Sequence, residues 1–325
     1  MSTFRYAILG AAKIGAKFCQ AASMIGNCEV CAVASKSLER AEEFAAKNGI
    51  PKAYDSYEEL LDKEKPDCAY IAVTPHDHYR LSRMCVERGI PVLCEKAMFI
   101  NSGEAESLYA LAKEKGVFVM EAMWSRFLPT MKKVKQWLAE DRIGIPEISQ
   151  LSIGFSAPEG ADNRYFNPKL GGGAARDITV YAYEITTYVL EQKIRRMEVS
   201  ATRGETGVDI NNHISIDFEY TLADLATSFV TKMNAGMILY GRKGKIVWPE
   251  PHHSFECFLY DGAGELVEHF VDQETKNGFV YELEETIRCI RAGLLESPVV
   301  PWKDTLECSR LFDRIDSCCN SPTMR

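Results

Sequence analysis

The chain has 325 residues, of which 46% are hydrophobic and 26% charged, a balance typical of a globular protein of one large or two ordinary domains. Acidic residues outnumber basic ones by 46 to 38, and no block of Lys and Arg occurs, which argues against a nucleic-acid partner. The N-terminus does not resemble a secretion signal, and no apolar run approaches the ~20 residues of a membrane span, so we expect a cytoplasmic protein with no membrane partner.

The first third of the chain alternates apolar strands with amphipathic helices. This alternation predicts a parallel sheet covered on both faces, and right-handed crossovers then make it a doubly wound fold that binds ligands at the carboxyl ends of its strands. The predicted strands are residues 5–10, 28–35, 67–73, 91–96 and 117–122, and the predicted helices are residues 13–26, 37–49, 54–61, 78–89 and 102–116.

After about residue 122 the pattern changes to short strands with turn signals between them, which predicts a large, mostly antiparallel sheet. The fold class is therefore an α/β Rossmann domain, residues 1–121, followed by an α+β domain, residues 122–325, whose last helices we expect to pack on the first domain. The predicted helices are 129–141, about 174–192, 278–292 and 303–317, and the predicted strands are 148–156, 195–203, 213–220, 225–231, 236–241, 244–249, 255–260 and 265–271.

Eleven cysteines are present, mostly within apolar segments where a thiol packs as a small hydrophobic group. One Cys-x-x-Cys pair, Cys28 and Cys31, has no second pair at zinc-ribbon spacing. The histidines at residues 76–78 and 252–253 have no carboxylate or cysteine partners at a recognisable metal-ligand spacing. We therefore predict reduced thiols and no metal site.

The turn after the first predicted strand has the sequence of a dinucleotide site. It reads Gly10-Ala11-Ala12-Lys13-Ile14-Gly15, the G-x-G-x-x-G fingerprint with Ala12 in place of the middle glycine. The first glycine permits the tight turn, the last allows close packing of helix on strand, and the helix N-terminus supplies N–H groups for a pyrophosphate. The predicted contacts here are Gly10, Ala12, Lys13 and Ile14.

The end of the second strand indicates which dinucleotide binds. An NAD site normally places an Asp or Glu there, to accept a hydrogen bond from the ribose 2′-hydroxyl. Here the strand ends in Ser35 and Lys36, and Arg40 follows one turn into the helix. Ser35 can hydrogen-bond a 2′-phosphate that the two cations neutralise. The alternative is that Lys36 and Arg40 are ordinary surface residues of a helix start, although the positive end of the helix dipole disfavours cations there. We predict NADP rather than NAD.

Seven segments spread along nearly the whole chain carry a resemblance to a known family. They are the Gly10 turn, residues 53–60, 93–96 and 121–127, residues 171–174 with Asp177 and Tyr181, residues 205–209 and residues 296–301. With these segments the chain resembles the glucose–fructose oxidoreductase/inositol dehydrogenase (Gfo/Idh/MocA) family of NAD(P)-dependent oxidoreductases, and within it the dimeric dihydrodiol dehydrogenases.

The resemblance implies a catalytic pair. In the family, the lysine of a Glu-Lys-Pro motif lies beside the nicotinamide and acts with a Tyr or His of the second domain, which here correspond to Lys96 and Tyr181. Asp177 and Tyr181 are four residues apart, so a helix places both on one face of an otherwise largely apolar segment. A buried tyrosine with its hydroxyl satisfied is the alternative.

The chemistry of alcohol oxidation needs both groups. A phenol has a reference pKa of about 10, and a neighbouring ammonium lowers it by stabilising the phenolate. Tyr181 would then carry the hydroxyl proton while Lys96 tunes and orients, and Asp177 would position either the substrate hydroxyls or the lysine. The family's proline after the lysine, often preceded by a cis bond, is Ala97 here.

Further site residues are expected by resemblance. Thr74, Pro75 and His78 would line the nicotinamide ribose, and Glu95 would contribute with Lys96 to the cofactor site. Trp124, Arg126 and Phe155 are the tentative substrate contacts, with packing roles as the alternative; Trp124 could stack on a ring substrate.

These patterns predict an NADP-dependent oxidoreductase that interconverts a secondary alcohol and a ketone on a sugar, polyol or cyclic diol. The alternatives are a non-catalytic NAD(P)-binding sensor or regulatory protein, and an NAD-dependent polyol dehydrogenase. An apolar antiparallel sheet face of the predicted size indicates a homodimer, as the resemblance also implies.

Overall fold

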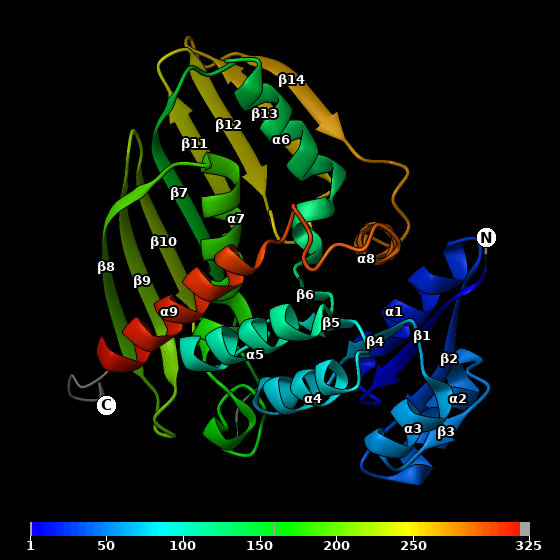
Figure 1. Ribbon diagram of the computed structural model, residues 1–325. Coiled ribbons are helices and arrows are strands. Elements are labelled where there is room, and N and C mark those ends of the chain that lie inside the picture. Colours follow the sequence, from blue (N-terminus) through cyan, green and yellow to red (C-terminus); the bar gives the residue numbers. More distant parts are fainter. Residues whose placement is uncertain (1, 159, 319–325) are drawn as a thin grey trace. The chain divides into compact units, whose positions relative to one another are not determined.

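The computed structural model describes residues 2–158 and 160–318, which form two compact units (Figure 1). The first unit runs to Trp124 and also includes Lys276–Ser309, and the second contains Ser125–Thr275 and the residues from Arg310 onward. The chain therefore leaves the first unit three residues after the predicted boundary at residue 121 and returns to it near the C-terminus.

The first unit contains a parallel sheet of six strands in the order β3-β2-β1-β4-β5-β6, which confirms the predicted doubly wound fold. The strand order reverses between β1 and β4, and such a switch point is where these sheets bind ligands. Only the two-residue β3 lacks a counterpart among the predicted strands. The strands are β1 (Phe4–Leu9), β2 (Cys28–Ala34), β3 (Ala53–Tyr54), β4 (Cys68–Ile71), β5 (Val92–Glu95) and β6 (Val119–Ala122).

Helices cover both faces of this sheet. Apolar side chains of α3, α4 and α5 pack against one face, in a core that includes Leu9, Ile71 and Cys94. On the other face, Phe18 of α1 stacks on Tyr70 of β4, with ring centroids 3.8 Å apart. The helices are α1 (Lys13–Met24), α2 (Leu38–Asn48), α3 (Tyr57–Glu64), α4 (Pro75–Glu87), α5 (Ser102–Lys115), α8 (Phe279–Arg291) and the first part of α9 (Trp302–Cys318).

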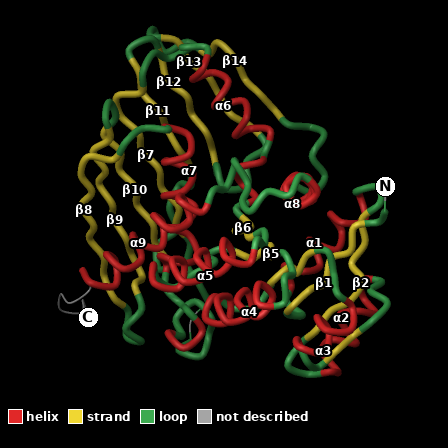
Figure 2. Tube along the Cα trace, in the orientation of Figure 1, coloured by secondary structure: helices red, strands yellow, loops and turns green. Residues whose placement is uncertain are grey.

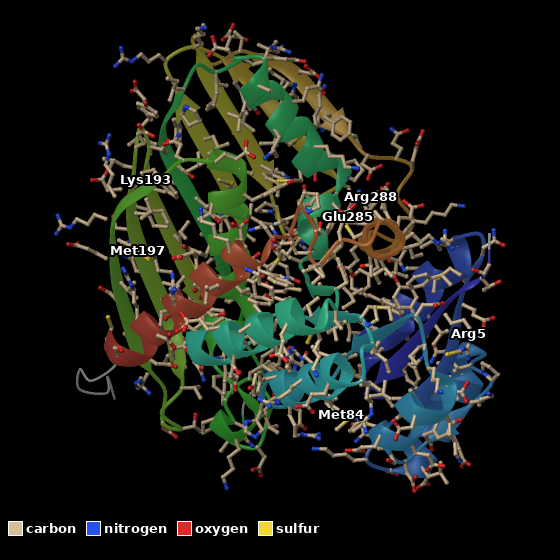
Figure 3. All side chains as sticks on the ribbon, viewed as in Figure 1. Arg5, Met84, Lys193, Met197, Glu285 and Arg288 are labelled. Atoms are coloured by element: carbon tan, nitrogen blue, oxygen red, sulfur yellow. The ribbon has the colours of Figure 1, made fainter. Side chains whose placement is uncertain are left out.

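Specific hydrogen bonds explain why α8 and the start of α9 belong to the first unit. The Tyr6 hydroxyl donates to Leu283 O at 3.2 Å, and the indole N–H of Trp302 donates to Val119 O at 2.8 Å. On α8 itself, Glu285 and Arg288 form an ion pair one turn apart, with 2.8 Å between Oε2 and Nε (Figure 3).

The second unit contains an eight-stranded sheet in the order β14-β13-β12-β11-β7-β10-β9-β8. Every neighbouring pair is antiparallel except β7 and β10, which confirms the prediction of a mostly antiparallel sheet. Met197 marks the edge strand β8 (Figure 3). The strands are β7 (Pro146–Gly154), β8 (Ile194–Arg203), β9 (Asp209–Phe218), β10 (Leu222–Ser228), β11 (Gly236–Gly241), β12 (Gly244–Pro249), β13 (Glu256–Asp261) and β14 (Leu266–Val271).

Two helices lie along one face of this sheet, as Figure 2 shows: α6 (Pro129–Ala139) contacts β13 and β14, and α7 (Val180–Leu190) contacts β7 and β10. The alternate side chains on the other face are only partly buried, and we call this surface the open face. Its half formed by β7 and β11–β13 is the more apolar one: it contains Gln150 and Lys245 but is otherwise dominated by Ile148, Ile238, Tyr240, Val247, Phe258 and Tyr260, and we call it the apolar half.

The helix predicted over about 174–192 is two structures rather than one. A π-helical turn, η3 (Ala175–Thr179), comes first, and α7 follows it directly. Short 3-10 turns also form at η1 (Trp124–Phe127) and η2 (Pro168–Leu170).

Candidate active site

The Gly10 turn has the geometry that a dinucleotide needs. Gly10 has φ +113°, and a Cβ there would lie 2.5 Å from Ala72 O, so only glycine fits this close approach of two strand ends. A Cβ on Gly15 would lie 3.0 Å from the Phe44 ring of α2 and 3.8 Å from Ile8 Cγ2 of β1, so the tightest contact at this glycine is with a neighbouring helix rather than with the strand. The cradle for a pyrophosphate is thus built as the sequence pattern requires.

Ala12 replaces the usual middle glycine without strain. It precedes α1 with φ −97° and ψ 159°, an extended conformation that any residue adopts. Lys13 and Ile14 then form the first turn of α1, which contains no acidic side chain. The backbone N–H groups and dipole of this turn favour an anion.

The end of β2 lies in a cluster of charged side chains. Lys36 Nζ is 2.7 Å from Asp77 Oδ2, and Arg80 Nε is 3.2 Å from Asp77 Oδ1. Burial opposes ionisation of Asp77, but hydrogen bonds from these two cations hold its pKa below the ordinary value. Asp77 and Arg80 are residues that sequence reasoning missed, because they reach β2 from a different helix, α4.

A third cation, Arg40, also acts near this cluster, as the pKa of Tyr57 indicates. Burial raises the pKa of its phenol, and the charges of Lys36, Arg80 and Arg40 oppose that shift. Ser35 lies beside them, buried, with its backbone N–H donating to Tyr54 O at 3.1 Å. The charges of Lys36, Arg80 and Arg40, together with that of Asp77, therefore act near this strand end.

The turn that carries Lys96 is held by buried side chains. The peptide bond between Lys96 and Ala97 is cis. Met98 N donates to Glu121 Oε1 at 2.9 Å, and the Thr305 hydroxyl donates to the other carboxylate oxygen of Glu121 at 3.0 Å. Glu121 thereby links the Lys96 turn to β6 and to α9.

His78 holds the same turn from α4, which begins after Thr74 with Pro75 in its first turn. Its ring lies between two backbone carbonyls, with Nδ1 2.8 Å from Ala97 O and Nε2 3.0 Å from Val73 O. Burial lowers the pKa of His78 to about 4, although the two carbonyls favour the charged form. With this pKa the ring is neutral near pH 7, and a neutral ring donates to only one of the two carbonyls.

Two carboxyl groups act near the end of β5, the partly buried Glu95 and the fully buried Glu282. The Tyr70 hydroxyl donates to Glu95 Oε1, and burial raises the pKa of Glu95 while Tyr70 and Lys96 oppose that shift. Glu282 of α8 is fully buried, and burial together with the charge of Glu95 raises its pKa well above the ordinary value. The neutral acid is thus the favoured form of Glu282, a residue absent from the predicted site.

In the second unit, Tyr181 lies in the first turn of α7 with 9% of its surface exposed. Its ring centroid is 5.5 Å from that of His252, which in turn stacks on His253 at 4.1 Å. Sequence reasoning considered these histidines only as metal ligands. Lys96 belongs to the first unit and Tyr181 to the second.

Asp177 lies within η3, where Arg164 Nη1 approaches its Oδ1 at 3.5 Å. The Arg164 guanidinium also stacks over the Tyr165 ring at 4.1 Å. Phe155 belongs to the same neighbourhood, since its ring centroid is 5.7 Å from that of Tyr165 and 5.4 Å from that of Phe229. Asp177 thus forms a charged pair with Arg164, and Arg164 in turn stacks on a ring of an aromatic cluster.

The other two tentative substrate residues lie in packed surroundings. Arg126 is fully buried, with Nη2 3.1 Å from Glu184 Oε2 and its guanidinium 4.7 Å from the Tyr188 ring centroid. In the first unit, the Trp124 ring lies 5.3 Å from that of Phe279. These are the contacts of packed side chains. Contact of Arg126 or Trp124 with a substrate stays a prediction.

The cysteines and metals can be assessed over the described part of the chain. Burial raises the pKa of both Cys28 and Cys31 to about 11, which disfavours the reactive thiolate. Among residues 2–158 and 160–318, no group of three or more His, Cys, Asp or Glu side chains could hold a metal ion. None of the helices formed by these residues is long and apolar enough to cross a membrane.

Two family models match this chain. Residues 4–123 match the Gfo/Idh/MocA model described as an oxidoreductase family with an NAD-binding Rossmann fold. Residues 131–247 match the Gfo/Idh/MocA C-terminal domain. Each match falls within one of the two compact units.

Curated relatives align with most of the chain. A trans-1,2-dihydrobenzene-1,2-diol dehydrogenase of Xenopus laevis is 33% identical over 296 residues, with 88% of each chain covered. The Mus musculus protein of the same name is 32% identical over 312 residues, with 93% of this chain and 92% of the relative covered.

Solved structures share the fold along its whole length. A 3-ketoreductase from Actinomadura kijaniata, solved with NADP, has a TM-score of 0.88 at 20% identity, with 100% of both chains covered. A levoglucosan dehydrogenase solved with NADH has a TM-score of 0.86 at 16% identity, with 97% of this chain and 96% of the other covered. At these identities the likeness shows the fold.

The neutral state of buried His78 predicts that the protein loses stability as the pH falls from 6.5 to 5. The folded pKa of about 4 is below the reference of about 6.5, so in this range the unfolded chain binds a proton that the folded chain does not. The stabilisation is complete above pH 6.5 and is lost towards pH 4, at about 1.4 kcal/mol per pH unit.

Denaturant unfolding at pH 7 and pH 5 checks this expectation. The wild type should lose about 2 kcal/mol more than His78→Gln over this interval, whereas the control His76→Gln should behave as the wild type. The raised pKa of Glu282 changes the stability with pH in the opposite direction. Because Glu282 is present in all three proteins, its contribution cancels when they are compared. The same pH dependence in His78→Gln and the wild type would contradict a neutral buried ring.

Proposed function

The chain belongs to the Gfo/Idh/MocA oxidoreductase family, and we propose that it is an NADP-dependent enzyme interconverting a secondary alcohol and a ketone. The substrate class is a sugar, polyol or cyclic diol, for which the dihydrodiol dehydrogenase names of the curated relatives give support. The observation that carries the proposal is the lysine at the end of β5, on a turn that Glu121 and His78 hold rigidly. We also propose that the protein acts in the cytoplasm, whose reducing conditions suit thiols without a disulfide bond such as those of Cys28 and Cys31.

Lys96 and Tyr181 are the proposed catalytic pair. The nicotinamide, when bound, supplies the hydride acceptor or donor. Tyr181 moves the hydroxyl proton of the substrate, and the Lys96 ammonium stabilises the phenolate that this requires. Asp177, beside Arg164, is positioned to orient substrate hydroxyls, and the aromatic cluster with Phe155 offers a flat surface for a ring.

The preference for NADP rests on the charged cluster at the end of β2. The structural relatives include one solved with NADP and one solved with NADH, so the fold alone does not select the cofactor. Lys36, Arg40 and Arg80 supply three cations, and Ser35 supplies a hydroxyl where an NAD site would carry an acid. One carboxylate, Asp77, leaves this cluster with a net positive charge for a 2′-phosphate.

We expect Lys36→Ala to weaken NADPH binding roughly 10-fold and to leave NADH binding unchanged, because only NADPH carries the 2′-phosphate that this cation would contact. Fluorescence titration of both cofactors measures the two Kd values. Lys47→Ala, which removes an exposed cation at the far end of α2, is the control and should change neither. An equal loss for NADPH and NADH would sink the NADP assignment, and tighter NADH binding by the wild type would favour the NAD-dependent alternative.

We expect Tyr181→Phe to lower kcat about 10²- to 10⁴-fold with NADPH affinity unchanged, since it removes only the proton-carrying hydroxyl. Steady-state rates with cyclic diols, aldoses and ketones measure this effect. Tyr188→Phe on the same helix keeps its ring contact with Arg126 and should retain the wild-type kcat. A wild type that binds the cofactor tightly but turns over none of these substrates would favour the sensor alternative.

The open face supports the proposal of a homodimer. Its apolar half is continuous across neighbouring strands: the register pairs Ile238 with Val247 and Val247 with Phe258. Ile148 on β7 is 38% exposed at the centre of the sheet. The other half is polar, with Glu198, Ser215 and Asp224. In a homodimer, the apolar halves of two copies would therefore pack on each other in a self-complementary contact.

Light scattering on the purified protein tests this interface. We expect a dimer for the wild type and for Ser215→Lys, which changes only the polar half of the open face. Ile238→Lys should give a folded monomer, because it places an unpaired charge in the apolar half. A monomeric wild type at micromolar concentration would rule out the homodimer.

A further inference from the structure

We infer that Asp209 is a positioning residue for the reaction: its buried side chain fixes the π-helical turn η3, and through it the orientation of Asp177 and Tyr181. This inference rests on the proposed function for the role of Tyr181. Asp209 opens β9 and lies at a distance in sequence from both residues. The geometry that supports it lies wholly within the second unit.

The carboxylate of Asp209 bonds directly to the first residue of η3. Asp209 is 3% exposed, and its Oδ2 accepts from Ala175 N at 2.7 Å and from Asn212 Nδ2 at 2.6 Å. Ala175 N lies at the start of the turn, where a helix leaves its N–H groups without partners in the helix itself. Asp209 therefore caps η3 from a neighbouring strand.

The glycine-rich segment before η3 is shaped around the same carboxylate. Gly173 has φ +120°, and a Cβ at this position would overlap Asp209 Oδ1, so glycine is required for both conformation and space. Gly173 N in turn donates to Tyr165 O at 2.9 Å. Asp209 thus connects η3 with the loop that carries Arg164 and Tyr165.

A second layer of hydrogen bonds holds the other end of η3. Asn212 Nδ2 also donates to the Thr179 hydroxyl at 3.1 Å, and this hydroxyl lies 2.7 Å from that of Thr227 on β10. Asn212 bonds to both Asp209 and Thr179, so one network from β9 and β10 fixes the first and the last residue of the turn.

The π geometry of the turn decides where Tyr181 points. Val180 N bonds to Ala175 O, five residues back, instead of to the residue four back as in an α-helix. If the turn relaxed to an α-helix, the residues after it would rotate by about 100°, the angle between successive residues. Tyr181 would then leave its contact with the His252 ring. A buried anchor at each end prevents this relaxation.

Three variants test the role of Asp209. Asp209→Ala removes both hydrogen bonds, whereas Asp209→Asn keeps an acceptor of the same shape. Asn211→Ala is the matched control, because Asn211 on the same strand also makes two side-chain hydrogen bonds, to Thr202 and Ser228, but none with η3. Thr179→Val loosens the other end of the turn without a change of shape.

Hydrogen exchange measured by mass spectrometry reports directly on the stability of the turn η3. We expect Asp209→Ala and Thr179→Val to speed exchange of amides 175–181, and Asp209→Asn and Asn211→Ala to leave it near the wild type. This measurement needs no substrate, so it remains decisive even if the proposed reaction is wrong. Unchanged exchange in both Asp209→Ala and Thr179→Val would overturn the inference.

Kinetics then separate positioning from general destabilisation. We expect Asp209→Ala to lower kcat roughly 10²-fold with Asp209→Asn restoring most of it, because a misplaced catalytic group costs about this much. In a Tyr181→Phe background the same change should cost less than about 3-fold, since Asp209 acts through the lost hydroxyl. Fully additive losses, or a loss of kcat in Asn211→Ala equal to that in Asp209→Ala, would also overturn the inference. Absence of turnover in the wild type would count against the proposed function alone.

Discussion

The position of Lys96 depends on buried side chains that bond to the backbone of its turn. Glu121 accepts from Met98 N, and His78 lies 2.8 Å from Ala97 O, so the turn is held from β6 and from α4 at once. Buried polar groups of this kind are costly to leave unpaired, which makes a loosened turn unfavourable. A lysine has a long flexible side chain, and a rigid backbone at its base limits the ammonium to a small volume.

The second unit holds the side chains that we propose for the chemistry by the same physical means. Asp209 bonds to Ala175 N, and Asn212 to the Thr179 hydroxyl, so strand residues hold the turn that carries Asp177. In both units the residues proposed for chemistry lie on short irregular segments, and buried carboxyl groups on neighbouring strands hold those segments in place. Preorganisation of this kind keeps reacting groups aligned without further loss of entropy on binding.

Electrostatics divides the first unit into two regions. Near the end of β5, desolvation raises the pKa values of the carboxyl groups of Glu95 and Glu282. At the end of β2, in contrast, Lys36 and Arg80 meet Asp77, whose pKa is lowered by their hydrogen bonds despite its burial. Burial therefore limits negative charge near the proposed hydride-transfer site, and the cations at the end of β2 supply the positive charge that we propose for the far end of the cofactor.

The sequence by itself determined the fold class and the place of the Gly10 turn, because hydrophobic periodicity and glycine requirements are local. The candidates Lys96, Tyr181 and Asp177 rest on the resemblance to the Gfo/Idh/MocA family, whose motifs are also local. It did not reveal β3, whose two residues are too few for a pattern, or the π-helical turn, since Ala175–Thr179 also fits an α-helical pattern. The contacts of Arg80, His252 and Asp209 likewise have no local signal, although Asp209 lies in a segment that the family shares. Only the tertiary structure brings these residues to Lys36, Tyr181 and Ala175, because contacts between distant segments depend on how strands and helices pack.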